Sequence, residues 1–179
     1  MTTDTKPQLE FSRPFNSDKL QDASRQENLT ANASERAALA KRFGIVSIEV
    51  FNAEITLSRV PNEPRVIDVR GTLQAVVTQN SVVTGEPVTQ TVSDTFDTMF
   101  ASEGYVERWL RDNPHDEYEA PEPLDNGWLD MGELVAQYLS LALDEYPREA
   151  NLPFMGDEDE PAPDKEPSPF AVLARLKQD

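Results

Sequence analysis

The stretch Gln79-Asn80-Ser81-Val82-Val83-Thr84-Gly85-Glu86-Pro87-Val88 lies between two runs that favour β-strands, residues 72–78 and 88–100. Both runs are rich in β-branched residues and alternate apolar with polar side chains. The segment from Thr84 to Pro87 is typical of a tight turn, because Gly85 can adopt a positive φ angle. Ser81 and Thr84 stand three positions apart, as the cysteines of a Cys-x-x-Cys knuckle do, but the chain contains no cysteine. The stretch therefore predicts a strand–turn–strand unit, and the rest of the chain is arranged around it.

Further strands are predicted on the N-terminal side of this unit. Residues 45–60 carry two apolar sets that change parity at Val50-Phe51, so a β-bulge there would keep both sets on the core. A turn over residues 60–64 leads to a strand over residues 65–69. Residues 9–15 alternate as a short strand, and Pro14 places it at an edge. Consecutive strands with short turns predict an antiparallel sheet that curls into a sandwich or partial barrel.

Two packed helices complete the expected α+β fold. Residues 32–43 begin with a capping box, in which Asn32 is the cap and Glu35 follows three positions later, and a glycine follows the last residue. Residues 130–146 begin with Asp130 as cap, carry a broad apolar stripe and stop before Pro147. This second helix is expected to pack on the open face of the sheet.

The first helix carries Arg36, Lys41 and Arg42 on its polar face, the one basic cluster visible in an acidic sequence. Two interpretations stay open. The cluster is either a solvated helix face or a contact surface for RNA or an acidic partner.

The second half of the chain is acidic. Residues 101–126 are interpreted as a partly ordered acidic insertion in a single domain that spans residues 9–152, after a flexible segment of residues 1–8. Residues 153–167 contain almost no apolar side chains and predict a disordered linker.

The last segment, residues 168–179, predicts a short amphipathic helix. Ser168 can cap it, a proline occupies the first helical position and Phe170 lies on its apolar side. Such a helix after a linker either docks on a partner or folds back on its own domain.

Composition limits the classes of function. The net charge of −17 repels phosphate backbones, so the chain as a whole should not bind nucleic acid regardless of sequence, and it suits a basic partner such as a ribosomal protein. No apolar run approaches the length that spans a membrane, and no leader pattern begins the chain. A soluble, cytoplasmic, monomeric protein is expected.

Sites for catalysis or cofactors are not indicated. The absence of cysteine removes disulfides, thiol nucleophiles and Cys-based zinc sites, and the single histidine, His115, stands in the acidic insertion without partners for a triad. No phosphate-binding glycine loop is present. We therefore expect no enzyme, no metal and no cofactor. The remaining catalytic hypothesis is an RNA hydrolase that uses Asp112, Asp116 and Glu117.

Five blocks, in order along the chain, carry a resemblance. They are Phe11-Ser12-Arg13-Pro14-Phe15, residues 35–43 (ERAALAKRF), residues 77–88 (VTQNSVVTGEPV), residues 141–148 (LALDEYPR) and residues 169–177 (PFAVLARLK). Together they resemble the YceD family of large ribosomal RNA subunit accumulation proteins, in its alphaproteobacterial form. In many members a cysteine stands at the position of Ser81, and in some a second one stands at Thr84, so a zinc or redox role of this block is excluded here.

The resemblance implies a non-enzymatic factor for large-subunit ribosomal RNA accumulation and ribosome assembly. Its partner would be a precursor of the large subunit, reached through ribosomal RNA or through a basic ribosomal protein. The alternative is an adaptor unrelated to RNA that docks through residues 168–179. The candidate binding surface comprises Arg36, Arg42, Gln79, Ser81, Thr84, Glu86, Pro87, Tyr146, Arg148 and Phe170.

Overall fold

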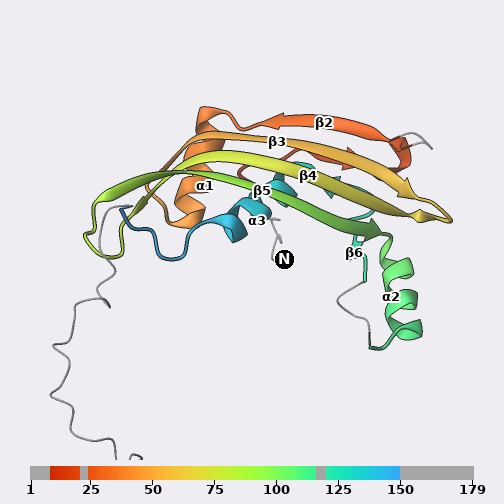
Figure 1. Cartoon of the computed structure of the whole chain (residues 1–179). Coiled ribbons are helices and arrows are strands. Elements are labelled where there is room, and N and C mark those ends of the chain that lie inside the picture. Colours follow the sequence, from red (N-terminus) through yellow and green to blue (C-terminus); the bar gives the residue numbers. More distant parts are fainter. Residues whose placement is uncertain (1–8, 21–23, 116–119, 150–179) are drawn as a thin grey trace, which may run out of the picture. The chain divides into compact units, whose positions relative to one another are not determined.

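Strand β4 lies in the middle of an open sheet of five strands (Figure 1). The computed structural model describes residues 9–20, 24–115 and 120–149. The chain divides into two units after Arg148, and every element below belongs to the first. The sheet order is β2-β3-β4-β5-β6, in which β6 runs parallel to β5 and all other neighbours are antiparallel. The strands are β2 (Arg25–Thr30), β3 (Ser47–Val60), β4 (Glu63–Asn80), β5 (Pro87–Ala101) and β6 (Glu122–Pro123).

The prediction of an α+β fold is confirmed, but the prediction of a sandwich or partial barrel is wrong. Helices α1 (Ala33–Phe43) and α3 (Met131–Ala142) cover one face of the sheet, together with a small sheet of β1 (Pro14–Asn16) and β7 (Trp128–Asp130) (Figure 1). These elements bury the apolar face of the strands, so the sheet needs neither a full-sized second sheet nor closure. Its other face carries mainly Thr, Ser, Asn and Gln side chains.

The bulge predicted in β3 is confirmed, although it lies slightly earlier in the strand. The register against β4 shifts between Ile48 and Val50. As a result Ile48 and Phe51 are both buried, whereas Val46 and Val50 stay exposed and do not join the core.

Strand β4 is one continuous strand where the sequence predicted two. Gly71 divides the predicted strands, and it pairs directly with Phe96 of β5. The Phe96 ring occupies the space above the glycine and stacks on Tyr138 of α3, with ring centroids 4.2 Å apart. The glycine that breaks the sequence pattern is therefore a position in a continuous strand where the Phe96 ring fills the space that a side chain would otherwise take.

Both predicted helices form, and their caps are as predicted. The Asn32 side chain accepts from the backbone of Ser34 and Glu35, and Gly44 ends α1 with a φ angle of 69°. Asp130 accepts from the backbone of Glu133 at the start of α3. Helix α3 ends at Ala142, four residues before the predicted end, because the chain turns into an extended conformation at Leu143.

Two elements form in the described part of the predicted acidic insertion, residues 101–126. Helix α2 (Glu103–Asp112) forms nearly three turns, and β6 adds a fifth strand to the sheet. Val106 of α2 packs with Val66 and Ala101 in a small cluster apart from the main core. Strand β2 and the 3₁₀ turn η1 (Ser17–Lys19) also have no counterpart in the sequence prediction.

The remaining sequence predictions concern the chain ends. The flexible segment of residues 1–8, the linker of residues 153–167 and the terminal helix of residues 168–179 lie outside the described residues. In the part of the chain that is described, no helix combines the length and the apolar character needed to cross a membrane.

Candidate functional site

The β4–β5 connection, residues 81–86, is held by a small network of hydrogen bonds. Ser81 donates its backbone N–H to the Glu86 carbonyl at 2.8 Å, and Gly85 donates to the Ser81 carbonyl at 2.9 Å. The Ser81 hydroxyl oxygen accepts from the backbone N–H of Val83 and of Thr84, both at 3.2 Å. Gly85 has a φ angle of 78°, as the turn prediction required. Ser81 is buried, so it organises the loop and is not itself presented to a partner.

A second segment far along the chain binds this loop. The backbone N–H of Val82 donates to the Pro147 carbonyl at 2.9 Å. The Gln79 side chain donates to the Asp144 carbonyl at 3.0 Å and accepts from the Gln90 side chain. Gln79 is buried as well. Residues 79–88 and 144–148 therefore form one surface, which we call the tied loop.

The tied loop exposes apolar side chains beside acidic ones. Val82 and Val83 are 58% and 52% exposed, and Tyr146 is 71% exposed. Further exposed residues of the surface are Thr84, Glu86, Pro87, Asp144, Glu145 and Arg148. Exposed valine and tyrosine side chains on a hydrogen-bonded support are typical of protein contact surfaces.

Arg36 and Arg42 both make contacts within the fold. Arg36 of α1 donates to the carbonyls of Ile48 and Ala31, at 3.2 and 2.6 Å. Arg42 forms a two-point ion pair with Glu133 of α3, at 2.7 and 2.8 Å. The hydrogen bond from Arg42 holds the pKa of Glu133 below its ordinary value. Arg36 and Arg42 therefore fasten α1 to its neighbours, whereas Lys41 of the same cluster is exposed.

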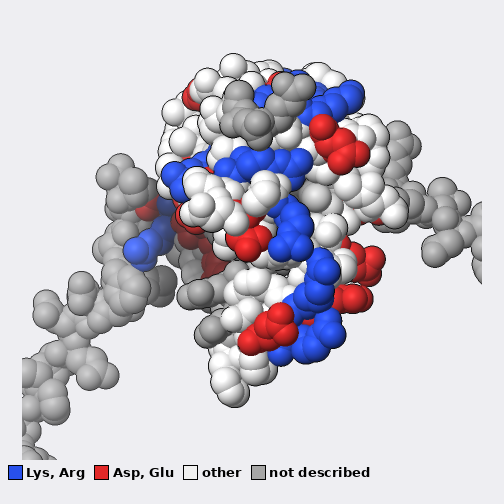
Figure 2. Space-filling view, turned by 90° about the vertical axis from the view of Figure 1, so that its right-hand side faces the viewer, with Lys and Arg blue, Asp and Glu red and all other residues white. Residues whose placement is uncertain are grey.

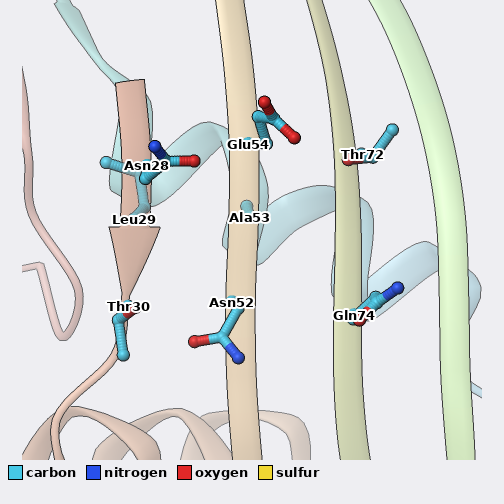
Figure 3. Close-up of a pocket in the computed structure, with 8 residues that line it drawn as sticks. All are labelled: Asn28, Leu29, Thr30, Asn52, Ala53, Glu54, Thr72 and Gln74. Carbon is cyan, nitrogen blue, oxygen red and sulfur yellow. The ribbon is translucent and has the colours of Figure 1, made fainter. Parts of the chain in front are cut away.

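The outer face of the sheet carries a shallow hollow of about 310 Å³. Figure 3 shows its side chains on three neighbouring strands, with Asn28 and Thr30 on β2, Asn52 and Glu54 on β3, and Thr72 and Gln74 on β4. The lining contains neither an aromatic ring nor a basic group. Bases would find no stacking platform there, and phosphates no cation.

A set of basic residues that the sequence analysis did not identify gathers at the end of the sheet opposite the tied loop. Figure 2 shows Lys and Arg side chains in a nearly continuous row on the face that includes α2. The basic residues of the elements at this end are Lys19 of η1, Arg25 of β2, Arg59 of β3, Arg65 of β4, and Arg108 and Arg111 of α2. They come from five separate elements, so no window of the sequence shows a basic run. Helix α2 itself could have been recognised in the sequence, because Tyr105 and Trp109 stand four positions apart and therefore share one face of a helix.

Residues for metal or acid–base chemistry are not assembled in the described part of the chain. It contains no group of three or more His, Asp or Glu side chains arranged to hold a metal ion. Asp112 and His115 are both exposed. Asp116 and Glu117, which the hydrolase hypothesis needs, and Phe170 of the candidate surface lie outside the described residues.

Comparison with known families decides the classification. The model of the family described as "Large ribosomal RNA subunit accumulation protein YceD" matches residues 69–177. The chain belongs to the YceD family. The match covers β4 from Val69 onward, β5 and α3, and with them both segments of the tied loop. The YceD family has no known catalytic activity. No curated protein and no solved structure matches the chain.

Proposed function

We propose that the protein is a non-enzymatic factor in large-subunit ribosomal RNA accumulation that acts during ribosome assembly. Its partner is a precursor of the large ribosomal subunit. Membership of the YceD family supports the proposal, because the family is named for this process. The order of the five sequence blocks supports the narrower assignment to the alphaproteobacterial form.

The observation that carries the proposal is the tied loop. Two blocks of the family pattern, one in the β4–β5 loop and one after α3, meet through backbone hydrogen bonds, such as the one from Val82 to Pro147. Their exposed side chains combine apolar contact area with the carboxylates of Glu86, Asp144 and Glu145. This chemistry suits a basic protein of the precursor, since complementary charge guides association and the apolar side chains stabilise the complex.

The proposal is tested by sedimentation. Lysates are separated on a sucrose gradient, and the tagged full chain is followed together with precursors of the large subunit. We expect co-sedimentation, and we expect the double variant V82S/V83S to reduce it because the exposed apolar contact is lost. The control V50S/M99S also removes two exposed apolar side chains, both outside the tied loop, and should sediment like the wild type. A wild-type chain that stays at the top of the gradient while precursors are present would contradict the proposal.

A further inference from the structure

The basic row is brought together by contacts between separate elements. Arg59 at the end of β3 donates to the Ser17 carbonyl at 2.8 Å, which places η1 and Lys19 beside this strand end. Arg25 at the start of β2 pairs in register with Leu57, which precedes Arg59 by two residues in β3. Arg65 of β4 lies over the Tyr105 ring of α2, 5.0 Å from its centroid. The row thus runs from η1 across the β3–β4 hairpin to α2, and we call it the basic end.

Several cations of the basic end are available to a ligand. Lys19, Arg108 and Arg111 enter none of the ion pairs within the described residues. The ion pair of Arg65 with Glu63 is long, at 3.6 Å, and the Arg65 side chain is 61% exposed. Arg42 at α1, by contrast, is bound at two points by Glu133. Free, exposed guanidinium groups are the donors that phosphate oxygens take.

A groove of about 320 Å³ opens between the β3–β4 hairpin and α2. Arg65 and Arg108 line it together with the aromatic side chains of Tyr105 and Trp109, both half-buried. Glu63, Asp112 and Asn113 complete the lining. Burial and the nearby Glu63 carboxylate raise the pKa of Tyr105, so the phenol stays protonated. Aromatic faces beside arginines are the combination that holds an unpaired base and its phosphates.

We propose that the basic end binds single-stranded RNA, with one base stacked in the groove against Trp109 and the flanking phosphates on Arg108 and Arg111. Carboxylates at the rim favour a base with an amino group, such as cytosine, since they accept its N–H hydrogens. Acidic side chains flank the row in Figure 2, so the cationic track is narrow and suits one strand better than a duplex.

This inference rests on the proposed function and deepens it by assigning a ligand class to a second surface. The tied loop and the basic end lie at opposite ends of β4, whose 18 residues span roughly 55–60 Å in extended conformation. A protein contact at one end and an RNA contact at the other can therefore be occupied at the same time.

The first test uses tryptophan fluorescence. The chain has two tryptophans, Trp109 and Trp128. In a full-length W128F variant, Trp109 is the only indole, and a 12-nucleotide oligocytidine should quench its emission at low salt because a base stacks on the ring. A 12-residue oligoglutamate of comparable charge should not. Equal binding of both probes without quenching would assign the basic end to an acidic protein and overturn the proposal.

The second test removes charge without touching the core. We expect R108Q/R111Q to weaken oligocytidine binding about tenfold and to reduce the slope of log Kd against log salt by about 1.4, the value for two phosphates of a single strand. The control K41Q/R70Q removes two exposed charges outside the groove and should bind within about twofold of the wild type. Circular dichroism should show the same thermal transition for all three proteins. Equal losses in the two variants would mean that only net charge matters, and would contradict a site at α2.

The outcomes separate the two proposals. Absence of oligocytidine binding by the wild-type chain overturns the RNA site, while the sedimentation result stands by itself. Quenching in a protein that never sediments with large-subunit precursors supports the RNA site and contradicts the proposed function.

Discussion

Gly132 is the residue where close packing and helix propensity disagree most. It lies in the first turn of α3, and a Cβ atom there would be 2.4 Å from the Phe11 carbonyl oxygen. The obstacle is backbone, which cannot rotate away as a side chain can. Residues 11–13 are held in place because Arg13 donates its backbone N–H to Asp130, at 2.8 Å.

We therefore predict that Gly132→Ala lowers the free energy of unfolding by about 2 kcal/mol or more, although alanine is the better helix former. The matched control is Gly104→Ala in α2, where no atom lies within 4 Å of the added carbon. That change should be neutral or stabilise by up to about 1 kcal/mol. Urea unfolding measures both variants. Equal behaviour of the two glycines would show that the N-terminal segment does not pack against α3 in this way.

Glycine is needed at position 85 because of the backbone conformation, and not because a side chain would lack space. Its φ angle is 78°, and no atom would touch an added Cβ. We predict that Gly85→Val costs about 1–2 kcal/mol through backbone strain, because a β-branched residue resists the left-handed region. Chemical-shift changes should be confined to the tied loop. Unchanged stability in the valine variant would mean that the turn does not hold a positive φ angle in solution.

Single residues were the level at which the sequence was most informative. Asn32, Glu35, Gly44 and Gly85 act locally, and their roles follow from rules about caps and turns. Gly71 was misread as a break between strands. What fills its place is the Phe96 ring from the next strand, a contact that no local pattern reveals.

At the level of elements, the ion pair between α1 and α3 should make the stability of the fold depend on pH. The folded state holds the pKa of Glu133 below its ordinary value through the hydrogen bond from Arg42. The stabilisation is complete above the pKa of Glu133 in the unfolded chain, near 4.3, and is lost as the pH falls through the lower pKa of the folded state.

We expect Glu133→Gln to lose on the order of 1 kcal/mol at pH 7 and to depend less on pH below about pH 5, since the titrating partner is gone. Urea unfolding between pH 3 and pH 7 measures the effect. Glu107→Gln is the control, because Glu107 is exposed on α2 and enters none of the ion pairs of the described residues. Parallel pH curves for wild type and Glu133→Gln would contradict the assigned role of the ion pair.

Elements with strong local signals were predicted, and elements defined by distant partners were not. The two capped helices and the β4–β5 hairpin were found. The strand β2 was missed, because its pattern of mostly polar side chains gives a half-exposed edge strand no clear alternation. Helix α2 was taken for a partly ordered acidic segment, since its apolar side packs on the small cluster around Val66 that only the folded sheet creates.

At the scale of the whole molecule, charge is distributed by folding and not by sequence alone. The basic face of α1, which the sequence left open as a solvated face or a contact surface, binds neighbouring elements through Arg36 and Arg42. The basic end is assembled from five elements and escaped detection. The net charge of −17 predicted repulsion of RNA by the whole chain, yet it does not describe the local field at α2.

The central claim is that the protein supports accumulation of large-subunit ribosomal RNA, and it is tested most directly by the ratio of large-subunit to small-subunit ribosomal RNA in cells without the protein. We predict that the ratio falls, and that the full wild-type chain restores it. A ratio that stays at the wild-type value in cells shown to lack the protein would contradict the account.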